Sequence, residues 1–386
     1  MQPSPSTPSK LKERLASLDF LRGADLFCIV AIEPIVHALR SALPEGSMDG
    51  MMWYFDHVEW EGLSTWDLIM PLFLFMSGVS VPFALGRHKE GGAGWPVYRR
   101  ILRRFVLLWL FGMLCQGNLL ALDPHHVYLY SNTLQAIAVG YLASTILFLN
   151  AGWRTMLATF VGLLAAFALA MGVVTVGDYG GGDYTQAHNL AEWIDTEVLG
   201  RFRDGATVVD GKVVVPAWNT YTWILSSLTF AATTLSGTLC GMVLKAKVLP
   251  SGKKLTIILG GGAAMLAAGY AASALGLPII KRIWSSSFVL VSSGWCLLLM
   301  GGLYWWIDMR NHKRGLTFLT IYGTNSITAY MLALCISFKS IVASIFYGTE
   351  HIVGSGWYGV VLAAGNAFII FLVLRAMYRK GVFLKV

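Results

Sequence analysis

Charged residues are scarce in this chain. Of its 386 residues, 13% are Asp, Glu, Lys or Arg, whereas 56% are hydrophobic. The mean hydropathy of +0.61 is too high for a soluble two-domain protein of this length. The composition therefore excludes a soluble globular protein and predicts one that crosses a membrane several times.

Cysteine is also rare, with five residues in the chain. Each lies in an apolar stretch, and their spacing does not match a metal-ligand motif. We expect them to be small buried hydrophobic side chains and predict no metal site. The five are Cys28, Cys115, Cys240, Cys296 and Cys335.

The first 17 residues lack the small-residue cleavage site that follows the apolar core of a signal peptide. They are polar and contain proline, so residues 1–17 are predicted to be a disordered cytoplasmic tail. Residues 18–386 are predicted to form a single transmembrane domain.

Ten apolar stretches are each about long enough to cross a hydrocarbon core of ~30 Å as a helix. We therefore predict an all-α, polytopic bundle of about ten transmembrane helices. A shorter apolar stretch at 338–347 leaves an eleventh segment open. The ten stretches cover residues 18–39, 65–85, 102–122, 132–149, 154–176, 222–243, 255–275, 284–306, 316–337 and 357–378.

The longest predicted segment outside the membrane is the loop 177–221. Residues 189–200 within it have apolar side chains at helical spacing and a terminal glycine, which predicts a short surface helix. Residues 208–215 predict a β-hairpin around Asp210 and Gly211. We expect this loop to form a lid or wall over the outer mouth of the bundle.

Lys and Arg are distributed unevenly between the two sides of the predicted bundle. With the N-terminus in the cytoplasm, 21 of the 29 basic residues fall on the cytoplasmic side, seven fall outside, and Arg22 lies within the first helix. Cytoplasmic loops of membrane proteins carry such an excess. Both termini are therefore predicted to be cytoplasmic. The bias also explains the net charge of +8, so we predict no nucleic-acid binding.

The first helix carries charged residues along one face. Asp19 lies three residues before Arg22, and Glu33 lies eleven residues after it, almost in register on a helix. An ion pair at the membrane interface explains Asp19 and Arg22 as well as a functional role does. Glu33 lies deeper and needs a partner or a raised pKa. Pro34 removes a backbone donor and predicts a kink.

Five further residues fall in the outer half or at the middle of the predicted membrane. For each alone, an interhelical hydrogen bond is a sufficient explanation. Together with Glu33 and His57 they favour a polar cavity that opens outward, so we predict that they bind substrate. They are Asp67, Gln135, Trp284, Asn325 and Ser326.

His57 lies in a polar, aromatic segment just ahead of the second apolar stretch. Histidine is the side chain best suited to moving protons near neutral pH. A single histidine in an outer loop is, however, usually just solvated. Composition alone therefore favours solvation over a catalytic role.

Three motifs around these residues resemble one family of membrane enzymes. They are Ser17-Leu-Asp-Phe-Leu-Arg-Gly23, Phe55-x-His-x-x-Trp-x-Gly62 and Asp67-Leu-x-x-Pro-Leu-Phe-Leu-Phe-x-x-Gly78. The pattern is similar to that of heparan-α-glucosaminide N-acetyltransferases, a family with a lysosomal member and bacterial relatives. Weaker similarities follow in the family's order at 134–135, 283–288 and 323–327, and the resemblance covers about residues 15–380.

The resemblance implies transfer of an acetyl group from cytoplasmic acetyl-CoA to an amino sugar across the membrane. It places the catalytic histidine at His57. The lysosomal enzyme also uses an asparagine in its first helix, and Glu33 stands at that position here. An ionised Glu cannot donate to an oxyanion as an amide does. Glu33 is therefore predicted to orient His57, to take its proton, or to donate as a neutral acid.

The leading hypothesis is a membrane-embedded, acetyl-CoA-dependent acyltransferase of a bacterial cytoplasmic membrane. In this hypothesis the acceptor is an amino sugar or other glycan. His57 acts as the general base of the reaction or as a transient acyl carrier. Arg22, Arg103 and Arg104, with Asp19 beside them, are predicted to hold CoA, although positive-inside charge explains the arginines equally well. The alternative is a transporter or flippase for a sugar or lipid-linked intermediate. Assembly into a homo-oligomer stays open.

Overall fold

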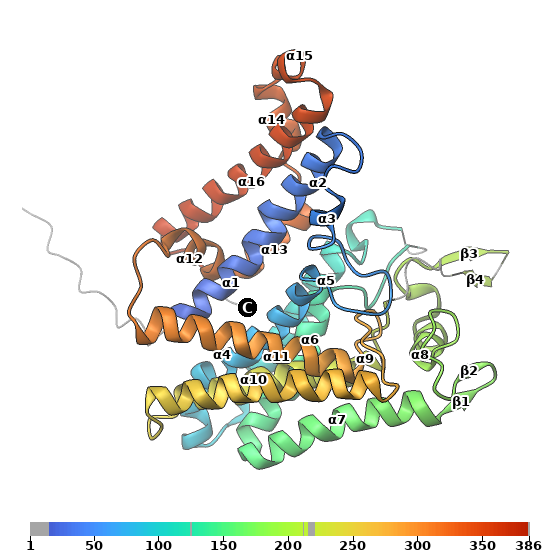
Figure 1. Ribbon diagram of the computed structural model, residues 1–386, viewed down its shortest axis with the longest axis vertical. Coiled ribbons are helices and arrows are strands. Elements are labelled where there is room, and N and C mark those ends of the chain that lie inside the picture. The colour runs from blue at the N-terminus through green and yellow to red at the C-terminus, as the bar shows by residue number, and fades with distance from the viewer. Residues whose placement is uncertain (1–14, 124–125, 211, 215–220, 385–386) are drawn as a thin grey trace, which may run out of the picture.

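The computed structural model describes residues 15–123, 126–210, 212–214 and 221–384. Helices dominate the described chain, and its strands form two small hairpins at one end of the bundle (Figure 1). The predicted tail at 1–17 lies mostly outside the described residues, and helix α1 (Ala16–Phe27) already begins within it. The all-α membrane fold predicted from composition is confirmed.

Within the described residues, seven helical segments are long and apolar enough to cross a membrane. The bent pair α12 (Thr317–Thr324) and α13 (Ser326–Cys335) forms an eighth if it counts as one span, with an angle of 78° between its halves. The seven are η2 (Trp66–Leu68) with α4 (Ile69–Gly91), α6 (Thr133–Asn150), α7 (Trp153–Val173), α9 (Ser226–Lys245), α10 (Ser251–Ala274), α11 (Ser286–Leu303) with the π-helical turn η5 (Tyr304–Met309), and α16 (Ser355–Arg379).

Two of the ten predicted spans are helical but contain charged side chains, and they are not among the seven segments. The first consists of α1, the π-helical turn η1 (Cys28–Ile32) and α2 (Glu33–Ala42), and the second is α5 (Trp95–Cys115) with its four arginines. The count of ten therefore stays a prediction. The stretch 338–347 forms α14 (Lys339–Ile345), whose seven residues are too few to cross a membrane. A kink was predicted at Pro34. The structure has the π-helical turn η1 just before this proline.

Glycines bring α4 and α9 close together, as the spacing of Gly237 and Gly241 predicts. A Cβ atom on Gly237 would overlap the carbonyl oxygen of Phe75, and one on Gly241 would overlap that of Val79. On the facing helix, a Cβ on Gly78 would overlap the carbonyl oxygen of Thr234. This contact fixes α4, which carries Asp67 at its start, against the middle of the bundle.

The cysteines are less uniformly buried than predicted. Cys240 and Cys296 are buried, whereas Cys28 and Cys115 are only partly buried and Cys335 is exposed. The Sγ atoms of Cys115 and Cys335 lie 3.2 Å apart, because the ends of α5 and α13 meet. Among the described residues, no three His, Cys, Asp or Glu side chains are placed to hold a metal ion.

The loop 177–221 packs against the segment that carries His57. It contains the strand β2 (Tyr179–Gly180), which pairs with β1 (Thr175–Val176) just before the loop. It also contains the helix α8 (Leu190–Leu199) and the paired strands β3 (Thr207–Val209) and β4 (Lys212–Val214). The predicted helix and hairpin are both confirmed, although Gly211 and Val215 lie outside the described residues. The indole Nε1 of Trp60 donates to the carbonyl oxygen of Tyr184 at 2.9 Å, and Glu61 forms a β-bridge with Ile280.

Helix α8 is anchored by buried polar contacts. The Asn189 side chain accepts from the N–H of Glu192 and caps the helix. Asp195 is fully buried and accepts from the N–H groups of Trp223 at 2.7 Å and Ile224 at 3.0 Å. Burial raises the pKa of Asp195 to about 7. These contacts anchor α8 and the described residues before it against the bundle, and the role of the loop as a lid or wall stays a prediction.

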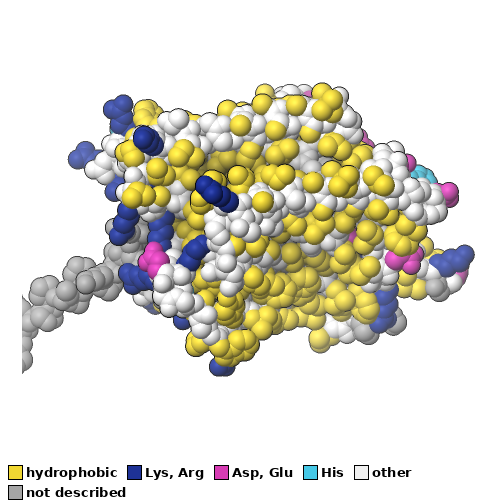
Figure 2. All heavy atoms as spheres, turned by 90° about the horizontal axis from the view of Figure 1, so that it is seen from below, with side chains coloured by type: hydrophobic (Ala, Val, Ile, Leu, Met, Phe, Trp, Pro, Cys, Tyr) yellow, Lys and Arg dark blue, Asp and Glu magenta, His cyan; other side chains and the backbone are white. Residues whose placement is uncertain are grey.

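Charge is unevenly placed on the surface. On the face drawn in Figure 2, hydrophobic side chains form the middle band. Most Lys and Arg side chains gather at the left end, whereas His and most acidic side chains lie at the right end. Such a band between two polar ends matches a protein embedded in a bilayer. Which end faces the cytoplasm stays a prediction.

Candidate functional site

His57 and Asp67 form a hydrogen-bonded pair where α4 begins. His57 lies in the connection between the short helix α3 (Asp49–Met52) and η2, and Asp67 is the middle residue of η2. The Nδ1 atom of His57 is 2.8 Å from Oδ1 of Asp67. Because a carboxylate only accepts, this contact is a hydrogen bond in the tautomer with the hydrogen on Nδ1, and in that tautomer Nε2 is the unprotonated base.

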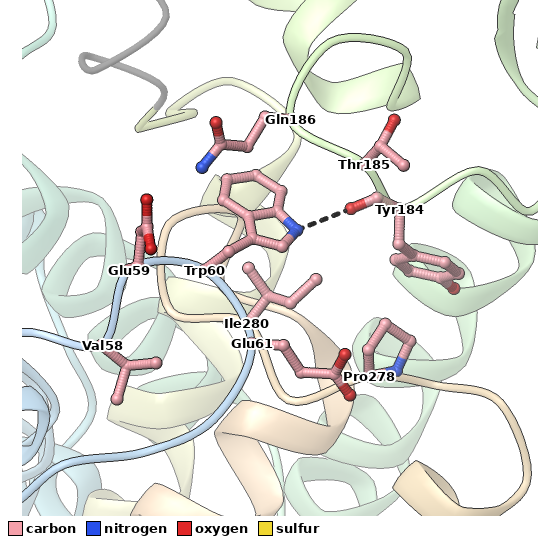
Figure 3. A pocket seen from close by; sticks show the side chains of 9 residues that line it. All are labelled: Val58, Glu59, Trp60, Glu61, Tyr184, Thr185, Gln186, Pro278 and Ile280. Carbon is pink, nitrogen blue, oxygen red and sulfur yellow. Dashed lines mark hydrogen bonds between the residues drawn. The ribbon is translucent and has the colours of Figure 1, made fainter.

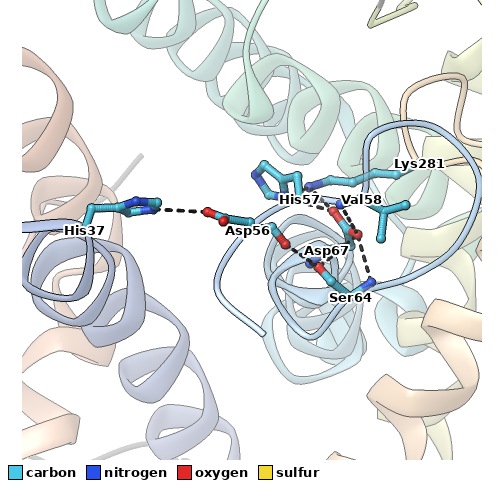
Figure 4. A network of polar contacts seen from close by, with 7 residues as sticks. All are labelled: His37, Asp56, His57, Val58, Ser64, Asp67 and Lys281. Atoms are coloured by element: carbon cyan, nitrogen blue, oxygen red, sulfur yellow. Dashed lines mark hydrogen bonds and ion pairs between the residues drawn. The ribbon is translucent and has the colours of Figure 1, made fainter. Parts of the chain in front are cut away.

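The second oxygen of Asp67 holds the connection in place. Oδ2 accepts from the N–H of Ser64 at 2.9 Å, from its hydroxyl at 3.0 Å and from the N–H of Val58 at 3.3 Å. The Ser64 hydroxyl also lies 2.8 Å from the carbonyl oxygen of Asp56. Asp67 thus fixes both the imidazole and the backbone around it (Figure 4).

Lys281 completes this cluster from a distant part of the chain. Its Nζ lies 3.1 Å from Oδ1 of Asp67 and 3.0 Å from Nδ1 of His57. It belongs to the segment between α10 and α11, and its side chain is 9% exposed. The ammonium group compensates the charge of the buried Asp67 carboxylate. Lys281 is one of the seven basic residues that fall outside in the predicted topology, and its contact with Asp67 was not predicted from the sequence.

Asp56, on the other side of His57, connects the site to the first helix. Its Oδ1 is 3.7 Å from Nε2 of His37, and its Oδ2 is 3.4 Å from an Arg40 nitrogen. Both partners lie on α2. Asp56 therefore joins α2 to the segment that carries His57 (Figure 4).

Glu33 is not the acid that contacts His57. It begins α2, is partly buried, and makes no hydrogen bond or ion pair with any other described residue. The anionic partner of the imidazole is Asp67 instead. A catalytic role for Glu33 stays a prediction.

A second polar region lies deeper in the bundle and is here called the bundle cavity, of about 210 Å³. The predicted residues Arg22, Arg104 and Ser326 all line it, whereas Arg103 is exposed and does not. The other lining residues are Phe73, Ser77, Ser80, Leu108, Thr133, Leu134, Ile137, Ile327 and Tyr330.

The arginines of the bundle cavity are held by neighbouring groups. Arg22 donates to the Ser80 hydroxyl at 2.7 Å and lies 3.9 Å from Asp19. The Arg104 guanidinium lies 4.2 Å from the centre of the Tyr141 ring. Ser80 lies 13 residues after Asp67 along the same helical segment, so the arginine end of the cavity is roughly 20 Å from the histidine site.

Three other residues that were predicted to bind substrate do not line the bundle cavity. Gln135 accepts from the N–H groups of Ser131 and Asn132 and donates to a carbonyl oxygen, in the capping box of α6. Trp284 is buried and donates to the Thr233 hydroxyl at 3.0 Å. Asn325 is buried at the bend between α12 and α13, and its amide has no hydrogen-bond partner among the described residues. Their substrate roles stay predictions.

A larger opening, here called the loop-side cavity, lies next to His57 and has a volume of about 660 Å³ (Figure 3). It lies between the residues after His57, the loop 177–221 and the segment before α11. Sequence reasoning missed it, because its walls come from three separate parts of the chain. The lining residues are Val58, Glu59, Trp60, Glu61, Tyr184, Thr185, Gln186, Pro278 and Ile280.

Comparisons with known proteins give a distant relationship. Residues 14–184 match a family described as a domain of unknown function, DUF5009. Human heparan-alpha-glucosaminide N-acetyltransferase is 28% identical over 125 residues, which make up 32% of this chain. The aligned region covers 17% of the human protein. The chain is therefore similar over part of its length to an N-acetyltransferase, and this supports a distant family relationship.

Proposed function

We propose that this protein is an acyltransferase of a bacterial cytoplasmic membrane. It moves an acetyl group from cytoplasmic acetyl-CoA to an amino sugar or other glycan acceptor on the outer side. The observation that carries the proposal is the hydrogen bond between His57 and the buried Asp67, with 44% of the histidine side chain exposed. A buried carboxylate that orients an accessible imidazole is the arrangement of a general base.

In the proposed reaction, the acceptor amine or hydroxyl attacks the thioester carbonyl. Nε2 of His57 takes the proton of the attacking group as the new C–N or C–O bond forms. The C–S bond then breaks, and the CoA thiolate leaves and takes up a proton. Asp67 keeps the imidazole in the tautomer with Nε2 free and stabilises the imidazolium that forms. Lys281 keeps Asp67 ionised in its buried position.

The bundle cavity is the proposed path for the thioester arm of the donor. Arg22 and Arg104 line the bundle cavity and supply two positive charges that would bind CoA phosphate groups. Its remaining walls are apolar or carry hydroxyl groups, which suits an arm that is itself a chain of amides and methylenes. The cavity follows α4 from Phe73 to Ser80, so the arm would point along this helix towards His57.

A second candidate function is transport of a sugar or lipid-linked intermediate. The 78° bend between α12 and α13 favours it, because broken helices form the substrate sites of many transporters. The unpartnered amide of Asn325 lies at this bend. A transporter would move its substrate without consuming acetyl-CoA.

The experiment that separates the two uses protein purified in detergent. It is incubated with acetyl-CoA and a panel of amino sugars and neutral sugars, and both free CoA and acetylated product are followed. Acceptor-dependent release of CoA with an equal amount of acetylated sugar supports the acyltransferase. Absence of product from every acceptor, together with uptake of a sugar by the same protein in vesicles, would favour the transporter.

A further inference from the structure

The thiols of Cys115 and Cys335 meet although the two residues are 220 positions apart in the sequence. They are the last residues of α5 and α13. Their Sγ atoms lie 3.2 Å apart, at hydrogen-bonding distance for two thiols. A disulfide joins sulfur atoms that are about 2.05 Å apart, so a shift of about 1 Å in the two side chains is enough to form the bond.

The surroundings of the two thiols are accessible from the edge of the bundle. Cys335 is exposed and Cys115 is partly buried. Exposed polar residues follow both cysteines, Gln116 directly after the first and Lys339 four residues after the second. Lysine side chains near helix ends reach the polar interface of the bilayer. The predicted topology puts this interface on the outer side, and disulfides form and persist outside the cytoplasm.

The other three cysteines are placed differently. Cys240 and Cys296 are buried within α9 and α11, and Cys28 lies partly buried in η1, within the first helix. Buried thiols in apolar surroundings are inert towards reagents in water. These three residues therefore serve as internal controls for the chemistry of the Cys115–Cys335 pair.

A bond between the two thiols would hold a helix that has few other anchors. Of the ten residues of α13, Ala329 and Tyr330 are buried. At the start of α13, the buried amide of Asn325 has no hydrogen-bond partner among the described residues. Further along, the Tyr330 hydroxyl accepts from Nδ2 of Asn132 at 3.4 Å. Segments with few buried side chains are those that open locally, so a covalent bond at Cys335 would restrain this half-helix.

The same bond would connect two walls of the bundle cavity. Leu108 lines the cavity from α5, and Ile327 and Tyr330 line it from α13. Cys115 lies seven residues after Leu108, and Cys335 lies five residues after Tyr330. At 1.5 Å per residue, both thiols lie roughly 10 Å beyond the cavity residues of their own helix. A disulfide there would fix the separation of the two walls.

We propose that Cys115 and Cys335 form a disulfide in the cell and that this bond holds α13 against α5. The oxidant is an oxidised dithiol oxidoreductase of the outer compartment. The thiolate of one cysteine attacks the S–S bond of the oxidant, and one sulfur of the oxidant leaves as a thiolate. The thiolate of the other cysteine then attacks the mixed disulfide and releases the second sulfur.

The exchange is balanced in atoms and electrons. The two cysteine thiols lose two protons and two electrons, and the oxidant becomes a dithiol. The inference goes beyond the proposed acyl transfer and does not depend on it, because thiol counts and backbone exchange test it without any substrate.

The first experiment counts free thiols in the wild-type protein as it leaves the cell. Membranes are quenched in acid, denatured and treated with N-ethylmaleimide, and the protein is then reduced and treated with iodoacetamide. Mass spectrometry of the peptides should find N-ethylmaleimide on Cys28, Cys240 and Cys296, and iodoacetamide on Cys115 and Cys335. N-ethylmaleimide on all five cysteines would overturn the inference. A disulfide that links two chains on a non-reducing gel would also contradict it.

The second experiment tests what the bond holds. Amide hydrogen exchange of the protein in detergent is compared before and after reduction. Exchange across α13 should become at least about tenfold faster on reduction, as expected when local opening becomes easier. Exchange across α9 should not change. Equal exchange across α13 in the two states would show that the bond does not restrain the helix, and this part of the inference would be wrong.

Two serine variants complete the comparison. Cys335→Ser should exchange rapidly across α13 with or without reductant, and its Cys115 should react with N-ethylmaleimide before reduction. Cys28→Ser is the matched control, because it removes a cysteine that lies outside the pair. It should respond to the reductant as the wild type does. A response to reductant that is lost in Cys28→Ser and kept in Cys335→Ser would assign the bond to the wrong pair.

Discussion

The Nδ1 atom of His57 lies 2.8 Å from Oδ1 of Asp67, although 44% of the histidine side chain is exposed and only 1% of the aspartate side chain is. The buried partner is fixed by Ser64, Val58 and Lys281, and the exposed one is followed in the chain by Val58, which lines the loop-side cavity. Asp67 thus holds the imidazole in place, and His57 is the accessible base. The first prediction concerns Asp67.

Asp67→Asn should reduce acetyl transfer by ~10²–10⁴, because an amide can present an N–H to Nδ1 and so favour the tautomer in which Nε2 carries the hydrogen. The measurement is kcat/KM with acetyl-CoA and a saturating acceptor. The control is Asp56→Asn, which changes the neighbouring acid that contacts His37 and Arg40 instead. A loss of the same size in both variants would mean that the effect is general disruption of the segment.

Lys281→Met should destabilise the protein, because it leaves the buried Asp67 carboxylate without its cationic partner. Breaking a buried pair in this way costs on the order of 3 kcal/mol. The midpoint of thermal unfolding in detergent should therefore fall, and Lys281→Arg should recover part of the loss. Lys339→Met, which removes an exposed lysine, serves as the control. Equal midpoints for the two methionine variants would show that the Lys281–Asp67 contact contributes no stability.

Asp195 should make stability depend on pH. Burial raises its pKa to about 7 in the folded protein from the ordinary 3.8. Between these two values the folded state holds a proton that the unfolded state has released. The contribution of Asp195 to stability is therefore fully present below about pH 4 and is lost as pH rises through about 7.

Asp195→Asn removes this titration. The unfolding midpoint of the wild type minus that of the variant should become smaller from pH 4 to pH 7 and then stay level. Glu197→Gln, on the exposed side of the same helix, should show a constant difference from the wild type. A difference for Asp195→Asn that grows with pH would contradict the raised pKa.

The histidine site should face the outside of the cell. Glu45 and Glu90 are exposed residues at opposite ends of the predicted topology, and each can be replaced by cysteine in a background without the five native cysteines. In intact cells, a membrane-impermeant thiol reagent should label Glu45→Cys and leave Glu90→Cys unlabelled until the cells are opened. The reverse pattern would place His57 in the cytoplasm and exclude transfer to an outer acceptor.

Local sequence signals predicted the elements around the site more successfully than its contacts. The helix after Asn189 and the hairpin around Asp210 were predictable, because capping and turn preferences act over a few residues. The capping box from Asn132 to Gln135 has the same kind of local signal. Gln135 was instead interpreted as a polar residue facing a cavity, because its capping role was not considered.

The contacts of His57 could not be derived in the same way. Lys281 is 224 residues from His57 in the sequence, and only the packing of the segment before α11 against the residues after His57 brings them together. Glu33 was predicted to orient His57, to take its proton or to donate as a neutral acid, and the structure places Asp67 against the imidazole. Helical periodicity places residues on a face, but it does not determine which neighbouring element that face meets. The bundle cavity was anticipated in part, since Arg22, Arg104 and Ser326 all line it.

The central claim is that His57 is the base for acyl transfer, and the most direct measurement is kcat/KM for His57→Ala beside His126→Ala. His126 also pairs with an aspartate, with its Nδ1 2.6 Å from Oδ2 of Asp123, but the Asp123 side chain is 42% exposed whereas Asp67 is buried. We predict that His57→Ala loses ~10²–10⁴ in kcat/KM with unchanged thermal stability, and that His126→Ala behaves as the wild type. If His57→Ala keeps more than about a tenth of the wild-type value, His57 is not the base.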